Sequence, residues 1–446
     1  MAWRKRGDAY DTLDGFRVGE LCGALGGFRN SEPCDTLDSS RGGKCTFLIA
    51  RETEDLLWLL SSGLSATYVL TLYSTPRGLA VSSSPGCSVT EQGEFGGNVN
   101  LKGYALGPSF FISRSWLCRE TMPSFLTPNR HGYSVRFSPF QPERIACATS
   151  QYFGLAGGGT LFLLEVVPDN GLVEVACTQW SDGLFDVAWS ETDANIIVSA
   201  SGDGGLQLWN MSCPQLPPQT FREHKKEVYS VDWSQTRQEQ FVLSASWDCS
   251  TKLWDPNRPN SLATFLGHTQ LVYSAMWSPH VPSCFASVSG DGTMKVWNTH
   301  MPQHPSMSLR AHDAEVLSCD WCKYDQNILA TGGSDGLIRG WDLRNITSPV
   351  FEQKGCEYAV RRVRFSPHNL SVLASVSYDF TTRIWDFKAS PDPLETVKHH
   401  SEFVYGLDFN DHVAGQIADC GWDSLVHVFS PRSLVSLSSA LAPPVK

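Results

Sequence analysis

The sequence predicts an all-β protein whose main part is a seven-bladed β-propeller. Two markers recur in step along the chain: an aromatic residue that ends a short strand-like run, and a turn aspartate six residues before it. The aromatics are separated by 45, 43, 44, 44 and 44 residues, and the aspartates keep the same intervals. Two markers held in register through six units indicate tandem copies of one structural unit. The aromatics are Trp209, Trp254, Trp297, Trp341, Trp385 and Phe429.

A seventh, degenerate unit precedes these six. One period before Trp209 the chain carries the run TLFLLEV around Leu164, with the strand-like runs GYSVRF and RIACATS upstream. Its turn has Gly158 where the other units have Asp, so this blade is expected to lack the usual polar turn contact. A period of about 40–45 residues is typical of WD40 repeats, each of which forms a four-stranded blade. We therefore expect a seven-bladed WD40 β-propeller over residues 130–431.

Each unit reads as a series of strands. Runs such as VYSVDW (228–233) and VYGLDF (404–409) are expected to be inner strands near the propeller axis. Second strands such as FVLSASW lead through the aspartate turn into a third strand such as TKLW. Helices should be almost absent from 130–431. The ring closes when a strand from one end of the chain completes the last blade, and either 124–128 or 434–438 can supply it.

Residues 1–121 do not follow the repeat, so the sequence divides into an N-terminal extension (1–121) and the propeller (122–446). We expect the extension to be disordered, or the natural protein to begin at Met122. Within the extension, Leu56 to Pro76 carries no charged side chain for 21 residues, about the length that spans a bilayer. Seven Ser or Thr residues and a Gly dilute this run, so no stable membrane insertion is expected.

Composition narrows the class of function. The formal net charge of −11 argues against nucleic acid as a partner, since phosphate neutralisation needs clustered Lys and Arg. The 14 cysteines are scattered singly through strand-like surroundings, which favours free thiols in a reducing compartment over a disulfide framework. The N-terminus lacks the charged-then-apolar layout of a secretory signal.

Histidines recur in step with the turn aspartates and predict a structural contact in each blade. A metal shared between units is excluded, because residues one period apart lie in different blades. Each His is instead expected to pair with the Asp of its own blade, extended by a strand hydroxyl and the terminal Trp indole. The residues of this turn lock are His224, Asp248, His268, Asp291, His312, Asp335, Asp379, His400 and Asp423.

Catalytic and cofactor motifs are not found. Cys319 and Cys322 form a C-x-x-C, but residues three apart on a strand point to opposite faces and no second pair completes a zinc site. No nucleophile elbow or phosphate-binding loop is present. We expect no enzymatic activity, no cofactor and no metal, and a function in protein binding.

The predicted binding surface is one mouth of the propeller. Residues before each turn aspartate and at the start of each inner strand open onto this face, and they vary while the framework repeats. Among them, large aromatics stand beside carboxylates, which suits an amphipathic basic helix. Arg361, Phe403 and Tyr405 also fall at these positions. The predicted contact residues are Asp182, Glu227, Tyr229, Trp247, Tyr273, Glu315, Tyr378, Glu402 and Trp422.

An ordered set of strings resembles the peroxin 7 family of WD-repeat receptors for the type 2 peroxisomal targeting signal. The resemblance runs from about Arg130 to Pro431 and covers none of the first 120 residues; the long N-terminal extension departs from the family pattern. The strings are RHGYSVRFSPF, WSDGLFDVAWSE, SGDGGLQLW, EVYSVDWSQTR, SWDCSTKLWDP, LSCDWCKYDQNILATGG, RGWDLRN and SYDFTTRIWDF.

This resemblance implies an import receptor that shuttles between the cytoplasm and the peroxisome. It would bind the N-terminal R-L-x5-H-L signal of matrix proteins such as thiolase and alkylglycerone-phosphate synthase. A co-receptor, the long form of the type 1 signal receptor, would help to carry the complex to the peroxisomal docking proteins.

The residues suggest how such a signal would bind. Residues seven apart nearly superpose on a helix, so the signal would present its leucines and basic groups along one stripe. We expect Trp247, Tyr273, Tyr378 and Trp422 to receive the leucines. Glu227, with Asp182 or Glu315 nearby, would pair with the signal's Arg and His.

A rival function belongs to another class. The run LIRGWDLR (337–344) also resembles the W-D-x-R box of propellers that act as substrate adaptors of cullin-type ubiquitin ligases. In that case Asp342 and Arg344 would contact the ligase linker.

Overall fold

The structure, a computed structural model, describes residues 122–435 except 169, 237 and 238, together with the backbone of four strands between 46 and 83. The chain divides into two compact units, Met1–Phe111 and Ile112–Lys446. Each unit is described by itself.

The N-terminal unit contains a four-stranded antiparallel sheet in the order β1-β2-β3-β4. Its strands are β1 (Thr46–Glu52), β2 (Asp55–Ser62), β3 (Ala66–Thr75) and β4 (Gly78–Ser83). The sequence does not predict these strands, because the runs do not alternate between polar and apolar residues. The uncharged run from Leu56 passes through β2 and β3, which pair with each other. No helix in the described part of the chain is long and apolar enough to cross a membrane. The expected disorder of 1–121 otherwise lies outside the described residues.

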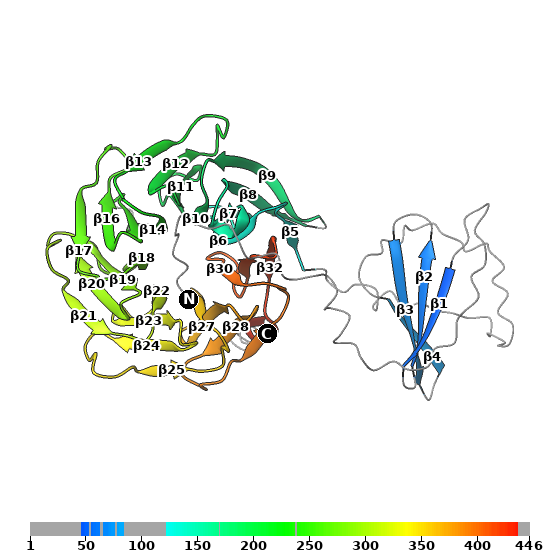
Figure 1. The fold of residues 1–446 in the computed structure, drawn as a ribbon. Coiled ribbons are helices and arrows are strands. Elements are labelled where there is room, and N and C mark those ends of the chain that lie inside the picture. Colours follow the sequence, from blue (N-terminus) through cyan, green and yellow to red (C-terminus); the bar gives the residue numbers. More distant parts are fainter. Residues whose placement is uncertain are drawn as a thin grey trace, which may run out of the picture. The chain divides into compact units, whose positions relative to one another are not determined.

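Seven four-stranded antiparallel sheets form the propeller, and Figure 1 looks down its axis. Blade 1 contains β6 (His131–Phe137), β7 (Arg144–Ser150), β8 (Gly159–Val167) and β9 (Gly171–Trp180). Blade 2 contains β10 (Leu184–Trp189), β11 (Ile196–Ser201), β12 (Gly205–Asn210) and β13 (Gln219–Arg222). Blade 3 contains β14 (Val228–Trp233), β15 (Val242–Ser246), β16 (Ser250–Trp254) and β17 (Ala263–Leu266). Blade 4 contains β18 (Val272–Trp277), β19 (Cys284–Ser289), β20 (Thr293–Asn298) and β21 (Met307–Arg310).

The remaining blades follow the same order. Blade 5 contains β22 (Val316–Trp321), β23 (Ile328–Gly333), β24 (Ile338–Asp342) and β25 (Phe351–Gln353). Blade 6 contains β26 (Val360–Phe365), β27 (Val372–Ser377), β28 (Thr382–Asp386) and β29 (Glu395–Val397). Blade 7 contains β30 (Val404–Phe409), β31 (Ile417–Gly421), β32 (Leu425–Phe429) and β5 (Ser124–Leu126).

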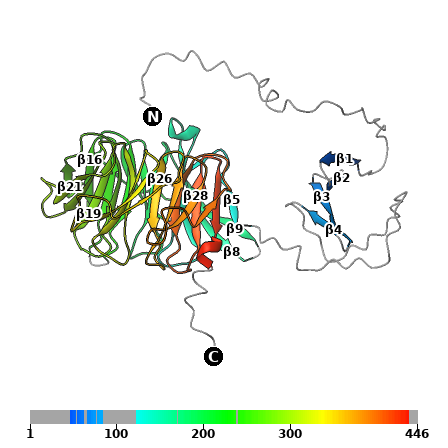
Figure 2. The same cartoon turned by 90° about the horizontal axis from the view of Figure 1, so that it is seen from below.

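The seven-bladed architecture predicted from the repeat is confirmed, including the degenerate first blade. The expected inner strands coincide with the first strand of each blade. Helical structure in the described propeller is confined to a 3-10 turn, η2 (Tyr152–Gly154), and a helical turn at 432–435. Figure 2 views the ring edge-on, with η2 rising from one face.

The ring is closed from the N-terminal side of the propeller, which decides between the two strands that the sequence left open. β5 pairs antiparallel with β32, with Leu126 opposite Leu425 and Ser124 opposite His427. The other candidate begins in the helical turn at 432–435, where Leu434 is buried against blades 6 and 7. Blade 7 is therefore built from both ends of the repeat region, so it cannot form until the ring closes.

Neighbouring blades are tied at the axis by inner-strand carboxylates. Asp232, Asp320 and Asp408 hold the same position of their inner strands, and each accepts a backbone N–H from the next blade. The last of these bonds crosses the closure, from blade 7 to blade 1. The donors are Trp277 at 2.8 Å, Phe365 at 2.8 Å and Phe137 at 2.9 Å. These bonds satisfy backbone donors that lie at blade edges, where no further strand can pair with them.

Candidate functional site

A β-bulge begins every inner strand. The pairing register skips one residue near the start of each, so that residue has no strand partner. Bulges bend the strand and re-aim the extra side chain. The skipped residues are Tyr133, Phe185, Tyr229, Tyr273, Leu317, Arg361 and Tyr405. All but the arginine belong to one buried cluster, which we call the aromatic floor.

Arg361 joins opposite sides of the aromatic floor. Its guanidinium lies 4.9 Å from the ring of Tyr229 and 5.0 Å from the ring of Tyr405, which come from blades 3 and 7. The residue is 2% exposed, so a cation–π contact here is desolvated and correspondingly strong. The sequence placed Arg361 on the open face; the structure buries it beneath the aromatic rings, because the bulge turns its side chain inward.

The aromatics expected to receive leucines all pack on this floor. Trp247 stacks on Tyr229 with 5.2 Å between ring centroids, and Trp422 stacks on Tyr405 at 4.8 Å. The hydroxyl of Tyr378 lies 3.0 Å from that of Tyr405. Trp247, Tyr378 and Trp422 are partly buried, whereas Tyr229 is buried.

Tyr273 also belongs to the floor and is 9% exposed. Burial raises the pKa of Tyr378 to about 12 and also raises that of Tyr273, so both hydroxyls stay neutral at physiological pH. A ligand at this mouth would therefore meet Trp247, Tyr378 and Trp422 before it reached the buried tyrosines.

Four predicted carboxylates surround the aromatics without a cationic partner in the described part of the chain. Asp182 Oδ1 accepts the backbone N–H of Gly183 at 2.7 Å, and Glu315 Oε2 lies 3.5 Å from the hydroxyl of Tyr273. Glu227 is partly buried and Glu402 is exposed. Unpaired carboxylates beside a low-dielectric aromatic surface create a negative rim that favours a cationic ligand.

An aromatic lip on blade 1 was missed by sequence reasoning. Tyr152 and Phe153 in η2 both have positive φ, 43° and 54°, and both are exposed. The Phe153 ring stacks on His131 at 3.9 Å and lies 5.2 Å from that of Trp422. Strained backbone of this kind persists where the surroundings enforce it, and it often lies at functional sites. The sequence feature that could have indicated this lip is the pair Tyr152–Phe153, which lies in the one turn that lacks the aspartate of the repeat.

The turn locks of blades 3, 4 and 5 share one geometry. In blade 3, His224 Nδ1 lies 2.8 Å from Asp248 Oδ2 and Nε2 lies 2.7 Å from Ser244 Oγ, which accepts the indole N–H of Trp254 at 2.8 Å. Because the serine accepts from Trp254, it donates to Nε2, and Nδ1 donates to the aspartate. Burial opposes ionisation of Asp248, but the hydrogen bond from His224 acts together with those from Ser250 and the Lys225 N–H to outweigh it, and the pKa is lowered.

The other two histidine locks repeat these contacts. His268 lies 3.1 Å from Asp291 and 2.8 Å from Ser287, and Trp297 completes the chain. The lock of blade 5 joins His312 to Asp335 at 2.9 Å and to Thr331, with Trp341 as the indole donor.

Blades 6 and 7 depart from this pattern. Asp379 of blade 6 pairs with Arg383 at 2.6 Å, since Cys356 occupies the position of the repeat's histidine. In blade 7, His400 lies 2.9 Å from Asp423, but its Nε2 faces Asp419 in place of a hydroxyl.

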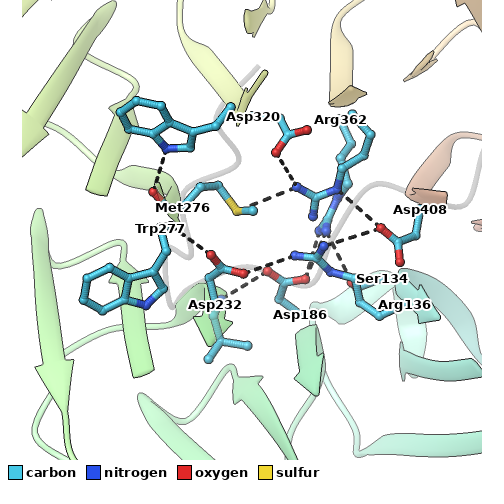
Figure 3. Close-up of polar contacts among 12 residues, drawn as sticks. Ser134, Arg136, Asp186, Asp232, Met276, Trp277, Asp320, Arg362 and Asp408 are labelled. Carbon is cyan, nitrogen blue, oxygen red and sulfur yellow. Dashed lines mark hydrogen bonds and ion pairs between the residues drawn. The ribbon is translucent and has the colours of Figure 1, made fainter. Parts of the chain in front are cut away.

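Deeper in the channel, charged side chains from different blades pair with one another (Figure 3). Both Nη atoms of Arg362, on blade 6, lie 3.1 Å from Asp186 Oδ1 on blade 2. Burial opposes ionisation of Asp186, but Arg362 and then Arg136 outweigh it and lower the pKa to about 2. Asp232 lies 3.6 Å from Arg136. Here burial has a larger effect than the charge of Arg136, so the pKa of Asp232 is raised to about 6.

The channel opens at the other mouth, where the inner strands end. A cavity of about 310 Å³ lies there, and Arg136, Asp232, Arg364 and Asp408 are among its lining residues. None of the predicted contact residues lines it. The predicted site is therefore a surface closed from below by its own aromatic floor, which suits a peptide more than a small molecule.

The rival W-D-x-R motif lies on the outer part of blade 5. Arg344 donates to both carboxylate oxygens of Asp342, with Nη2 2.7 Å from Oδ2 and Nε 2.8 Å from Oδ1. The two residues therefore satisfy each other.

Comparison with known proteins agrees with this architecture. Four segments match the WD40 family (WD domain, G-beta repeat), at 216–255, 259–298, 303–342 and 347–386. The chain is 52% identical over 174 residues to the human peroxisomal targeting signal 2 receptor, covering 39% of this chain and 53% of that protein. It is 54% identical over 160 residues to the mouse receptor of that name, covering 36% and 50%.

The Saccharomyces cerevisiae receptor of the same name is 35% identical over 198 residues, covering 38% of this chain and 52% of that protein. The chain thus spans about half the length of the curated relatives that it matches. The comparisons do not favour the ubiquitin-ligase adaptor. This chain contains a seven-bladed β-propeller, four segments of which match the WD40 repeat family, and the propeller is similar to receptors for the peroxisomal targeting signal 2.

Proposed function

We propose that this chain is an import receptor, not an enzyme, that binds the type 2 peroxisomal targeting signal of matrix proteins and delivers them to the peroxisome. The similarity of its propeller to receptors named for this signal carries the proposal. The negative, aromatic mouth supports it, because the signal R-L-x5-H-L presents leucines and cations together. A receptor of this kind shuttles between the cytoplasm and the peroxisome.

The signal helix lies across the aromatic floor in this proposal. Its leucines contact Trp247, Tyr378 and Trp422, with Tyr273 beneath them. Its Arg and His face Glu227 together with Asp182 or Glu315. The free signal is unstructured and loses entropy when it folds, so the preformed floor favours binding by costing no reorganisation of the receptor.

Thiolase and alkylglycerone-phosphate synthase are the proposed cargoes, and the long form of the type 1 signal receptor is the proposed co-receptor. The lip formed by Tyr152 and Phe153 stands at the edge of the same mouth, beside Trp422. A co-receptor that contacts both the lip and the bound signal would slow release of the cargo until the complex reaches the docking proteins.

Glu227→Lys tests the site. Fluorescence anisotropy measures the affinity of a labelled R-L-x5-H-L peptide, with and without the co-receptor. A partly desolvated charge pair contributes about 1–3 kcal/mol, and the reversed charge adds repulsion, so the dissociation constant should rise at least about tenfold. The matched control is Asp411→Lys, the same change of charge at an exposed residue lining the opposite mouth.

Two results would count against the proposal. Wild-type affinity of Glu227→Lys for the peptide would show that Glu227 makes no charge contact with the signal. An equal loss of affinity in Asp411→Lys would show that the loss is an effect of net charge alone. Absence of peptide binding by the wild-type chain in both arms would overturn the receptor function itself.

A further inference from the structure

Three histidines meet inside blade 7, the blade that closes the ring. His399 and His400 precede β30, and His427 lies on β32. One ring nitrogen from each lies within 4.8 Å of those of the other two. The ring centroids of His399 and His427 are 4.4 Å apart, and those of His400 and His427 are 4.9 Å apart. The turn-lock pattern of the repeat accounts for His400 alone.

In blades 3 and 5 the position of His427 holds a cation that pairs with a carboxylate. His427 corresponds to Lys252 of blade 3, whose Nζ lies 2.9 Å from Glu223, the residue that corresponds to His399. In blade 5 the corresponding cation, Arg339, pairs with Glu352 at 2.7 Å. Where blade 3 has this Lys–Glu pair, blade 7 has two imidazoles.

The imidazole of His427 does not gain a hydrogen-bond partner in place of the charge pair found in blade 3. It is 8% exposed, and neither of its ring nitrogens has a hydrogen-bond partner among the residues that the structure describes. A buried polar group without a partner costs free energy, so such an atom needs an explanation. The Nδ1 of His399 is unpartnered in the same way.

The surrounding carboxylates have the arrangement of a metal site. Nε2 of His399 lies 2.8 Å from Asp419 Oδ2, and Nε2 of His400 lies 3.1 Å from Oδ1. Nδ1 of His400 donates to Asp423 at 2.9 Å. Histidines that bind metals commonly donate their second N–H to a carboxylate, which fixes the ring and its tautomer.

We propose that His399, His400, His427 and Asp419 bind a divalent transition metal of the zinc class. Imidazole nitrogens with one carboxylate oxygen are ligands that Zn²⁺ accepts in tetrahedral geometry, at about 2.0–2.2 Å. Ligand atoms that bind one metal ion at about 2.0–2.2 Å lie closer together than the 4.8 Å found here. The three ring nitrogens therefore need to approach one another by roughly 1 Å. The metal takes the place of the protons in the hydrogen bonds that now join His399 and His400 to Asp419.

The site would hold the closure of the ring. Its ligands come from three segments of blade 7: the loop before β30, the strand β31 and the strand β32. His427 lies directly opposite Ser124 of the closing strand β5. A metal that binds only the folded blade stabilises the closed ring by mass action.

The test compares the full-length wild-type chain with His399→Glu/His427→Lys. This double variant installs the Glu–Lys pair of blade 3, so the blade keeps a charge pair at these positions. The control is His304→Lys, which removes an exposed histidine. Chains stripped with EDTA are titrated with ZnCl2, bound zinc is counted by elemental analysis, and thermal unfolding is followed with and without zinc.

We expect wild type and His304→Lys to bind one more zinc per chain than the double variant, and zinc to raise the unfolding midpoint only in those two. Equal zinc binding by the double variant would overturn the proposal. Cobalt substitution of the wild type gives a second readout that needs no variant. A tetrahedral Co²⁺ spectrum without thiolate charge transfer supports the site, whereas a thiolate band places the metal on cysteines and rejects it.

Discussion

Replacing Asp186 by Asn tests the ion pair that joins opposite blades across the channel. Both Nη atoms of Arg362 lie 3.1 Å from Asp186 Oδ1, and Nη1 lies 3.4 Å from Ser134 Oγ. The side chains of Arg362 and Asp186 are 7% and 2% exposed. The substitution keeps the shape, and the amide oxygen can still accept the N–H of Val231, which Asp186 Oδ2 now accepts at 3.1 Å. What it removes is the charge.

The expected loss follows from burial. A guanidinium deprived of its counterion in the interior costs about 3–5 kcal/mol, because water cannot reach it to replace the carboxylate. Natural proteins are stable by only about 5–15 kcal/mol, so this loss is a large share of the total. It corresponds to a shift in the folding equilibrium of roughly a hundredfold or more.

Urea unfolding, followed by tryptophan fluorescence and extrapolated linearly to water, measures the loss. The control is Asp313→Asn, whose side chain is 96% exposed and whose loss should stay below about 0.5 kcal/mol. Arg362→Met in the Asp186→Asn background removes the stranded charge and should recover much of the loss. A loss below about 1 kcal/mol in Asp186→Asn, or no recovery in the double variant, would refute this reasoning.

Four further predictions concern other parts of the propeller. Arg361→Leu should weaken signal binding at least about fivefold in the anisotropy assay while the fold persists by circular dichroism, since it removes two cation–π contacts that hold the floor; unchanged affinity contradicts this. Burial raises the pKa of Asp232 to about 6, above its unfolded value of 3.8, so its contribution to stability is present below about pH 4 and is lost as pH rises through about 6. Asp232→Asn should flatten the dependence of the free energy of unfolding on pH in this range, and an unchanged dependence would contradict the raised pKa of Asp232. Asp248→Ala should cost about 1–3 kcal/mol in urea unfolding, because His224 loses its acceptor; a change within error rules out the lock. Phe125→Asp, on the closing strand, should lower the unfolding midpoint by several degrees, because a charge replaces a ring that packs 5.7 Å from its neighbour on blade 1; an unaltered midpoint shows that closure does not limit stability.

Much of the fold could be predicted from the sequence because its signals are local and repeated. The aspartate turn and the aromatic that follows it by six residues recur in six units, so each unit reinforces the assignment of the others. The strand VYSVDW is an inner strand because its apolar side chains must face the neighbouring blades. The turn lock is local as well, since His224 and Asp248 belong to one blade.

The candidate site could be predicted only in part. Trp247, Tyr378 and Trp422 occupy positions that the repeat makes equivalent, so the sequence could place them on one face. It could not show that Arg361 lies beneath the rings, because that depends on a bulge and on contacts with blades 3 and 7. The lip at Tyr152 escaped for a different reason, since its turn departs from the repeat.

What the sequence by itself determined is therefore whatever one repeat encodes: the strand order, the turns, the number of blades and the face that carries the aromatics. Only the tertiary structure decided which contacts bring different blades together. These include the pairing of the closing strand Ser124–Leu126 with blade 7 and the pairing of Arg362 with Asp186. The physical reason is that such contacts join residues distant in sequence, and their geometry exists only once the ring has closed.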